Sequence, residues 1–584
     1  MNRSPGRVSI PKILAWGSVP RGTWSLITDL PIFGAGLALC YVFILLARYW
    51  AGPFTPSVDI SRSPSALPLY AVYSLLRIGV AYFLSLVFTL IYGYVAAYNA
   101  KAERIMIPLL DILQSIPVLS FLPGVMLAMV SLFPRHQLGV ELGAILLIFT
   151  GQVWNMAFSF YSSVKSIPRD LREAARLYRF SAWQRFVQLE LPYAGIGLIW
   201  NSMMSVAGGW FFLMACEMFV LGSRDFRLPG LGSYLQTASS AGDTHAILLG
   251  LITMISVIVI LDQIVWRPLI AWAQKFKFEQ VESSEEPHSP VLGFLQRSHA
   301  LSVVSHRFTR PLGERIALYF AERERAPSAT GRVAQARKWA LRVIAALVAM
   351  GILLAVVDAL RLLAGLSSED LKALVLGALA TFLRVLCVLL IGTAWTVPVG
   401  IWIGFNPRLA RIAQPLAQIA ASVPATALFP VVLLVLIRIG GGLGVGSIVL
   451  LLLGTQWYVL FNVIAGAMAI PSDLKEAAAV FRFGRRECWQ LLILPGIFPY
   501  LITGLVTAAG GAWNASIVAE YFHFGGKTIS TVGLGAAISQ ATDSGNFRLL
   551  LAATIFMAAF VVTVNRTIWR PMYGLAETRF KLES

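Results

Sequence analysis

Residues 166–192 read SIPRDLREAARLYRFSAWQRFVQLELP, and residues 469–495 read AIPSDLKEAAAVFRFGRRECWQLLILP. Each stretch has a proline, an acidic and basic start, Glu-Ala-Ala, and a second proline nineteen residues after that glutamate. The first proline suits a helix start, and the aspartate two residues later places negative charge near the helix's positive end. The pattern predicts a short helix held between two anchored segments. Its paired alanines predict a thin surface that another protein can approach closely.

The two stretches belong to a longer internal repeat. A single offset kept over about 190 residues, apart from one gap of four, indicates a duplication. With a shift of 307, Arg77 falls on Arg384, Gly93 on Gly400, Pro108 on Pro415, Pro117 on Pro424 and Pro123 on Pro430. With a shift of 303, Trp154 falls on Trp457, Glu217 on Glu520, Gly230-Leu231-Gly232 on Gly533-Leu534-Gly535, and Trp266-Arg267-Pro268 on Trp569-Arg570-Pro571.

The composition places this repeat in a membrane. Hydrophobic residues make up 57% of the 584 residues and charged residues only 13%, whereas a soluble domain carries about a quarter charged residues. A soluble enzyme, a disordered chain and a fibrous chain are therefore excluded. The net charge of +18 fits Lys and Arg in cytoplasmic loops better than nucleic-acid binding. The scattered cysteines and histidines form no metal-binding spacing.

Twelve stretches are long and apolar enough for a spanning helix, which needs about 20 residues. Each half holds six, an even number, so both halves enter the membrane in the same orientation. We predict an all-α polytopic membrane protein built as two parallel six-helix repeats. The predicted spans are 30–48, 68–98, 105–132, 138–161, 192–217, 246–266, 339–362, 371–404, 409–437, 445–465, 496–520 and 548–568.

The doubled Glu-Ala-Ala stretch resembles the EAA loop of permease subunits in ATP-binding-cassette importers. The resemblance covers about 70–266 and 377–570 and implies a type I importer with a MetI-like fold. It also implies that the loop forms a coupling helix, which docks in a cleft of an ATPase subunit. The implied ATPase-coupling residues are Glu173, Ala174, Ala175, Arg179, Glu476, Ala477, Ala478 and Arg482.

One position departs from this family pattern. The family's glycine, six residues after the glutamate, is Arg179 in the first copy and Arg482 in the second. Ser181 and Gly484, two residues later, are then the residues expected to make the turn. The two arginines add a cation that can pair with an acidic ATPase surface.

Further motifs resemble the nitrate/sulfonate/taurine (NitT/TauT-type) branch of the family. That branch usually uses two separate permease chains, whereas here the two are fused, as in some ferric-iron and thiamine permeases. The motifs are Ser74-Leu75-Leu76-Arg77, Pro108-Leu109-Leu110-Asp111 through Ser115-Ile116-Pro117, and Trp513 with Ala519-Glu520.

Partners and topology follow from the resemblance and from the loop charges. The sequence holds no G-x-x-x-x-G-K-[ST] phosphate loop, so we expect no catalytic site, cofactor or metal in this chain. The resemblance implies two ATPase subunits that bind ATP and Mg, a periplasmic or lipid-anchored solute-binding protein, and contact with membrane lipid. Basic short loops place both termini in the cytoplasm, and the implied location is a bacterial inner membrane.

The predicted domain order follows from these spans and loops. It is an N-terminal cytoplasmic segment (1–29), a first permease domain (30–266, coupling loop 162–192), a cytoplasmic linker (267–338), a second permease domain (339–570, coupling loop 466–495) and a cytoplasmic tail (571–584).

Charged groups inside a membrane are costly and are therefore candidates for the substrate pathway. Arg77 and Glu217, with their counterparts Arg384 and Glu520, lie toward the outer face by helical rise. One alternative is that they pair within each half or reach out to the lipid headgroups, and the other is that they face the central axis, where the arginines would attract an anion. The other pathway candidates are Trp210, Trp513, Gln152, Asn155 and Gln456.

The expected function is inward transport of a small anionic solute of the nitrate, sulfonate, taurine or bicarbonate class, driven by separate ATPases. A ferric-iron or thiamine-type solute is the nearest alternative. An ion-coupled secondary transporter would need titratable groups in the membrane, for which Asp111 and Asp262 are the loose candidates. An exporter or lipid-moving complex is the third alternative.

Overall fold

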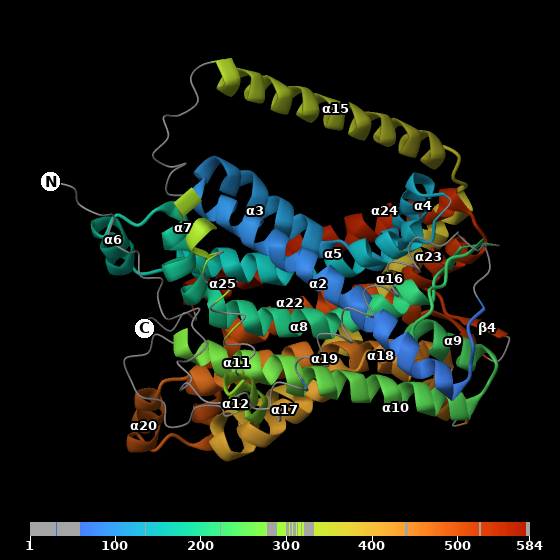
Figure 1. The fold of residues 1–584 in the computed structure, drawn as a ribbon. Coiled ribbons are helices and arrows are strands. Elements are labelled where there is room, and N and C mark those ends of the chain that lie inside the picture. The colour runs from blue at the N-terminus through green and yellow to red at the C-terminus, as the bar shows by residue number, and fades with distance from the viewer. Residues whose placement is uncertain are drawn as a thin grey trace.

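The computed structural model consists of long helices that run side by side (Figure 1). Short helices and loops gather at the two ends of the bundle, and helix α15 (Arg332–Leu363) lies along its outside (Figure 1). The described residues are 31, 59–134, 136–221, 224–276, 289–298, scattered positions between 303 and 319, 332–438, 442–524 and 527–579.

Eight helices in the described part of the chain are long and apolar enough to cross a membrane, or nine if one bent pair counts as a single span. The predicted span 30–48 lies outside the described residues except for Pro31, and α15 covers the predicted span 339–362. The total of twelve therefore stays a prediction. The eight helices run Pro64–Tyr98, Leu138–Lys165, Ala182–Glu217, Thr244–Ala273, Ser368–Phe405, Leu443–Ala469, Arg485–Ala519 and Phe547–Ala576.

The predicted spans 105–132 and 409–437 are both broken before a proline. A proline disfavours helical geometry in the residue before it, and Ile116 and Val423 are both extended. In the second half the axes on either side of the break differ by 77°. From the sequence, the prolines at 108, 117 and 123 predict a broken or kinked helix in the first half; the break occurs at Pro117, whereas Pro108 lies inside a helix. The segments are α3 (Ala100–Ser115), η3 (Val118–Phe121), α4 (Leu122–Leu132), α17 (Pro407–Ser422) and α18 (Ala425–Arg438).

The two halves repeat the same order of elements. In the first half α5 packs between α2 and α8, and in the second half α19 packs between α16 and α22. Each set is followed by an antiparallel hairpin, a short helix and a further long helix. The small hairpins were not predicted from the sequence.

These elements have the following bounds. The first half contains α2 (Leu67–Tyr98), α5 (Leu138–Lys165), α8 (Leu191–Glu217), β1 (Val220–Leu221), β2 (Arg224–Asp225), α9 (Leu231–Ser240) and α10 (Thr244–Leu261). The second half contains α16 (Ser368–Phe405), α19 (Leu443–Ala469), α22 (Leu494–Ala519), β3 (Tyr521–Phe524), β4 (Lys527–Ser530), α23 (Leu534–Asp543) and α24 (Phe547–Val564).

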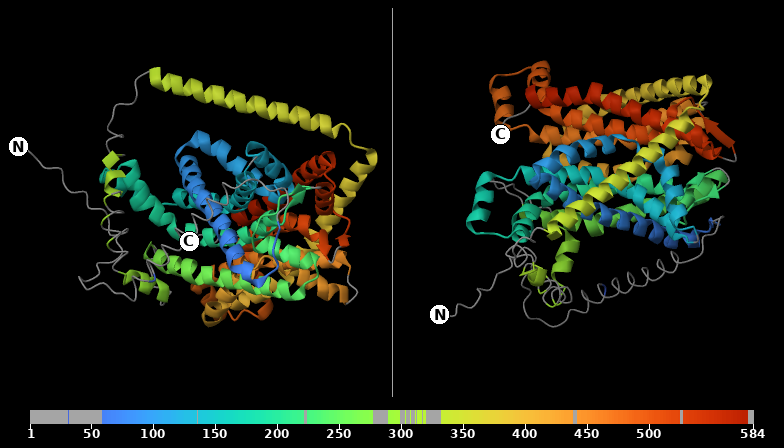
Figure 2. Two further views of the ribbon diagram at one scale, coloured as in Figure 1. Left: turned by 45° about the vertical axis from the view of Figure 1, so that its right-hand side comes forward. Right: turned by 90° about the horizontal axis from the view of Figure 1, so that it is seen from above.

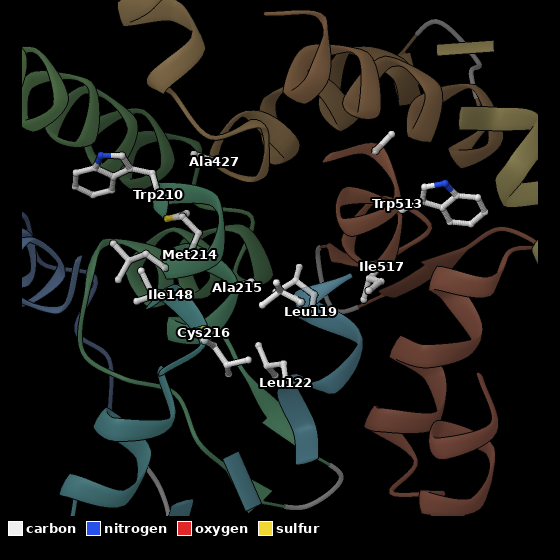
Figure 3. Close-up of a cluster of buried hydrophobic side chains, with 14 of the residues drawn as sticks. Leu119, Leu122, Ile148, Trp210, Met214, Ala215, Cys216, Ala427, Trp513 and Ile517 are labelled. Atoms are coloured by element: carbon white, nitrogen blue, oxygen red, sulfur yellow. The ribbon is translucent and has the colours of Figure 1, made fainter. Parts of the chain in front are cut away.

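One buried apolar cluster joins the halves. The segment after each broken helix contacts the other half, because η3 lies against α22 and α18 lies against α8. Figure 3 shows Leu119 of η3 on the side facing Ile517 of α22, and Ala427 of α18 on the side of Trp210. The backbone N–H of Leu119 also donates to Asn514 Oδ1 at 3.4 Å. The halves are therefore joined through the breaks in their helices.

The two Glu-Ala-Ala stretches lie at the same end of the bundle and project beyond it (Figures 1 and 2). They form α6 (Arg169–Leu177) and α7 (Ala182–Arg185) in the first half, and α20 (Ser472–Val480) and α21 (Arg485–Glu487) in the second. The remaining segments are η2 (Pro64–Ala66), η4 (Phe186–Glu190), η5 (Asp262–Trp266), α11 (Arg267–Ala273), η6 (Gln274–Phe276), α12 (Pro290–Gln296), η8 (Cys488–Ile493), η9 (Asn565–Trp569) and α25 (Arg570–Arg579).

Candidate coupling loops and buried ion networks

Helices α6 and α20 begin as the sequence indicates. Pro168 and Pro471 stand at the N-cap position, one residue before the first helical turn. Asp170 and Asp473 lie in that first turn, where a carboxylate interacts favourably with the helix dipole. The expectation of two short helices with acidic starts is confirmed.

The paired alanines are not a free outer face. Ala175 and Ala478, the second alanine of each pair, are buried within the protein. Ala174 and Ala477 are half-buried, and Glu173 is exposed. The close approach that these buried alanines permit is therefore toward the protein's own helices, and the glutamate side of each helix faces outward.

Both helices end in the same Schellman motif. The backbone N–H of Phe180 donates to the carbonyl oxygen of Ala175 at 3.0 Å, and that of Arg179 donates to Arg176 at 3.0 Å. In the second copy the N–H of Phe483 donates to Ala478 at 2.9 Å. This motif requires a residue in the left-handed conformation just past the helix, a position that glycine usually fills.

In this protein the left-handed residue is an arginine in both copies. Arg179 and Arg482 each have φ of 50°, and they are the two non-glycine residues with positive φ in the described part of the chain. A side chain in this conformation costs about 1 kcal/mol relative to glycine. The expectation that Ser181 and Gly484 make the turn is wrong, because the turn occurs two residues earlier.

Ser181 and Gly484 instead cap the next short helices. Ser181 Oγ accepts from the backbone N–H of Gln184 at 3.2 Å, and the Gln184 side chain accepts from the Ser181 N–H at 2.9 Å. In the second copy the Gly484 N–H donates to Glu487 Oε2 at 2.7 Å. These positions orient the chain that leads back into the membrane.

The tip of each loop, defined as Leu177–Arg179 and Val480–Arg482, is exposed. Leu177 and Tyr178 are 83% and 77% exposed, and their counterparts Val480 and Phe481 are 78% and 74% exposed. In both copies the exposed aromatic ring lies close to the phenylalanine that follows the arginine. Each tip therefore presents an aliphatic side chain, an aromatic ring and a guanidinium group to the surroundings.

A network of charged and aromatic side chains connects the first loop to the helix bundle. Arg185 Nε donates to Glu190 Oε1 at 2.7 Å, and the hydroxyl of Tyr98 donates to the same oxygen. The guanidinium of Arg185 also lies over the Tyr98 ring at 4.5 Å and donates to the Tyr94 hydroxyl at 3.2 Å. The Glu190 side chain is fully buried, so this network fixes α7 to α2.

The second loop has a cavity at the equivalent place. Phe405, Cys488 and Ile493 occupy the positions of Tyr98, Arg185 and Glu190, and they line a cavity of about 560 Å³. Lys475 and Arg482 also line this cavity. The Lys475 ammonium lies over the Phe405 ring at 4.8 Å, and partial burial lowers the pKa of this lysine.

Arg77 is the centre of a buried network near the other end of the first half. It donates two hydrogen bonds to Glu141, each of 2.7 Å, and one of 2.7 Å to Glu217 Oε1. All three side chains are fully buried. The Glu217 carboxylate also accepts from Ser74 Oγ and from the backbone N–H of Gly232, both at 2.7 Å.

The second half has a smaller version of this network. Arg384 donates to Glu520 Oε1 at 2.7 Å and to Thr531 Oγ1 at 2.9 Å. The Arg384 side chain is 13% exposed. At the shift of 303, Gly444 stands where the first half has Glu141, so Thr531 takes the place of the second carboxylate.

Two glycines leave the space that these carboxylates fill. A Cβ atom on Gly230 would come within 2.3 Å of the Glu217 carboxyl group, and one on Gly533 within 2.0 Å of Glu520 Oε2. The Glu520 carboxylate accepts from the N–H groups of Gly535 and Ala536. Each glutamate thus caps the helix that follows its hairpin, which explains the repeated Gly-Leu-Gly.

The arginines and glutamates therefore pair within each half, which is the first of the two alternatives. An anion could reach Arg77 or Arg384 only after these carboxylates separate. Glu141 was missed because it has no counterpart in the repeat. The role of the two Gly-Leu-Gly motifs was also missed, although their shared offset with the glutamates was visible in the sequence.

The other pathway candidates lie within the long helices α5, α8, α19 and α22. Trp210 and Trp513 are buried in the apolar core (Figure 3), and Gln456 is partly exposed. Asn155 Oδ1 accepts from Gln114 at 3.3 Å. Gln152 is fully buried, and its amide atoms have no hydrogen-bond partner among the described residues.

The carboxylates suggested for ion coupling give little support to that alternative. Asp262 pairs with Arg267 at 3.3 Å near the loop-bearing end of α10. The side chain of Asp111 lies outside the described part of the structure.

Comparison with known families decides what this architecture is. The profile of the family described as "Binding-protein-dependent transport system inner membrane component" matches residues 64–265 and 396–568. Together these two matches cover more than half of the chain, and each contains one of the two Glu-Ala-Ala stretches. The chain belongs to this family. The match occurs twice, as the fusion of two permease domains requires.

Three relatives of this permease are named for bicarbonate, nitrate and taurine. Bicarbonate transport system permease protein CmpB of Synechococcus elongatus is 27% identical over 172 residues, which are 30% of this chain and 59% of the relative. Nitrate import permease protein NrtB of Leptolyngbya laminosa is 26% identical, over 30% of this chain and 58% of the relative. Taurine transport system permease protein TauC of Escherichia coli is 28% identical, over 32% and 65%. The permease thus matches less than two thirds of each relative's length.

Proposed function

We propose that this permease is the fused membrane subunit of an ATP-binding-cassette importer. It moves a small anion of the nitrate, bicarbonate or sulfonate class inward across a bacterial inner membrane. Two separate ATPase subunits bind ATP and Mg on the cytoplasmic face, and a solute-binding protein delivers the anion from the other side. Both termini and the linker 267–338 are then cytoplasmic.

The pair of matched loops at one end of the bundle carries this proposal. Each loop presents an exposed tip on a helix with both ends anchored, and each lies in a separate match to the family. A rigid projecting helix transmits a push from a docked subunit into α5 and α8, or into α19 and α22. Closure of two ATPases would then rock one half against the other and expose the pathway alternately to either side.

The pathway is proposed to run between the halves at mid-bundle. Gln152, Asn155 and Gln456 are polar groups at this depth, and Trp210 and Trp513 lie on matched helices beside the shared core. The buried amide of Gln152 is a hydrogen-bonding group available to a solute or to water in another conformation. The Arg77 and Arg384 networks are proposed to hold α9 and α23 at the outer end, and would contact an anion only if they open.

Uptake by reconstituted vesicles tests the proposal. Vesicles containing the permease with its co-purified ATPase, with the solute-binding protein on the opposite side, should accumulate labelled nitrate, bicarbonate or taurine only with ATP and Mg on the ATPase side. Replacing Glu173 and Glu476 together with Arg should abolish uptake and leave the bundle folded. Uptake that proceeds on an ion gradient without any ATPase would overturn the proposal in favour of a secondary transporter.

A further inference from the structure

The two strained arginines carry an inference that rests on the proposed function and refines it. Arg179 and Arg482 both occupy the left-handed position of the Schellman motif. Glycine would satisfy the same backbone hydrogen bonds without strain. The backbone alone therefore gives no reason for an arginine at either place.

The neighbouring residues differ between the two copies. Leu177-Tyr178 in the first tip corresponds to Val480-Phe481 in the second, and Arg176 corresponds to Ala479. The arginine and the phenylalanine after it are the same in both copies. The two tips thus present different aliphatic and aromatic side chains, whereas both have the same guanidinium group at a conformationally unfavourable position.

The left-handed turn also determines where the guanidinium stands. It places the arginine at the far end of α6 or α20, next to two side chains that are each at least 74% exposed. Both arginines are themselves exposed. A guanidinium presents a planar fork of donors that matches a carboxylate, and adjacent exposed apolar side chains can exclude water from such a pair.

We propose that Arg179 and Arg482 each form an ion pair with a carboxylate on the surface of the docked ATPase subunit. The neighbouring aliphatic and aromatic side chains pack around this pair. Both loops use the same contact, so a single acidic patch on the ATPase, present once in each of two copies, serves both sites. The strain at φ 50° is the consequence of placing the charge at the tip.

Three substitutions at these positions separate charge from backbone strain. Gly removes both the charge and the strain, Ala removes the charge and keeps the strain, and Lys keeps both. Each is made at both arginines in the full chain, purified by a tag together with the ATPase subunit that accompanies it. The matched control is Arg104→Gln with Arg408→Gln, which removes two exposed positive charges near the starts of α3 and α17, at the same end of the bundle.

The retained ATPase is measured against sodium chloride concentration, and the thermal stability of each permease is measured alone. The Gly and Ala double variants should bind the ATPase about 10-fold more weakly at low salt, which is about threefold for each arginine. The Lys variant should bind more tightly than the Gly and Ala variants because it keeps the charge, but more weakly than the wild type because it lacks the planar fork of donors. The control should bind nearly as the wild type does. High salt should reduce the differences in ATPase retention among the variants. The Gly variant should unfold at a temperature no lower than that of the wild type.

Several outcomes would overturn the inference. Equal ATPase retention by the Gly variant and the wild type would show that the guanidinium has no docking role. Weaker flotation of the Gly variant with phosphatidylglycerol vesicles, at unchanged ATPase retention, would assign the arginines to the membrane surface instead. If the wild type retains no ATPase at all, the proposed function fails and this inference fails with it.

Discussion

The two halves of the permease share their helices but differ in the charges that they bury. In the first half Arg77 lies between two buried carboxylates, Glu141 and Glu217, whereas in the second Arg384 has one carboxylate and a threonine hydroxyl. At the loop-bearing end the difference is larger. The network of Tyr98, Arg185 and Glu190 has only apolar residues and a cysteine as its counterpart, around a cavity.

The difference separates two kinds of buried polar group. Glu217 and Glu520 accept hydrogen bonds from backbone N–H groups at the start of a helix, and both halves have them. Glu141 and Glu190 serve only side chains, and the second half replaces each of them. A carboxylate that satisfies the backbone cannot be lost alone, because the helix end would keep its unpaired donors. A network of side chains can be replaced as a whole by apolar residues.

The largest expected effect is at Arg77. Arg77→Gln leaves two fully buried carboxylates without their cation, and should cost about 3–5 kcal/mol of stability. Arg384→Gln removes a cation whose side chain is 13% exposed and leaves one buried carboxylate, Glu520, and should cost about 1.5–3 kcal/mol. Thermal unfolding in nanodiscs, followed by tryptophan fluorescence, measures both.

Adding Glu141→Gln to the Arg77 variant should restore part of its loss, because one buried charge is removed. Equal losses of stability from Arg77→Gln and Arg384→Gln would contradict the proposed difference between the two halves. Loss of uptake at unchanged stability in the arginine variants would instead support their direct contact with an anion.

The next effect concerns the network under the first loop. Arg185→Cys alone leaves the buried Glu190 unpaired and should cost about 3 kcal/mol. The triple change Tyr98→Phe, Arg185→Cys and Glu190→Ile installs the residues of the second half and should come within about 1 kcal/mol of the wild type. The same unfolding assay checks this, and a triple variant no more stable than the single one would refute the idea of replacement as a unit.

A smaller effect is expected from the two glycines that face the carboxylates. Gly230→Ala and Gly533→Ala would place a methyl group into the space of Glu217 and Glu520, and should each cost about 2 kcal/mol. Gly510→Ala is the matched control, because its added Cβ meets no atom within 4 Å. Unfolding temperatures of the three variants compare them directly, and a control as damaging as the other two would argue against the steric account.

The smallest effect is a pH dependence limited to the second hairpin. His523 Nε2 lies 2.7 Å from Asp543, and this hydrogen bond raises the pKa of the imidazole. The pair therefore stabilises the hairpin fully below the unfolded pKa of about 6.5, and the gain is lost as pH rises through the raised value. Both side chains are partly exposed, so the gain stays within about 1 kcal/mol.

Hydrogen exchange of the β3 and β4 amides across pH 5 to about 9 measures this loss. Asp543→Asn should remove the pH dependence, and the first hairpin, whose ion pair is Arg227 with Asp225, should show none in this range. A dependence that persists in the Asn variant would assign the titration to another group.

Much of this arrangement could be predicted from the sequence, and the rest could not for identifiable reasons. The repeat offset and the Glu-Ala-Ala stretches predicted the two matched halves and the two short helices, and the prolines at 108, 117 and 123 predicted a broken or kinked helix. The left-handed turn at Arg179 was missed, although the family's glycine stands at this position, because an arginine disfavours the left-handed conformation. Glu141 was missed because it occurs in one half only, and comparing the two halves identifies only the residues that they share.

Native mass spectrometry of the purified complex tests the central claim most directly, because it counts the ATPase subunits held by one permease chain. The account predicts two subunits on the wild type, one after Tyr178→Asp in the first tip, and none after Tyr178→Asp with Phe481→Asp. Two subunits retained by the double variant, or a wild-type chain that holds none, would contradict it.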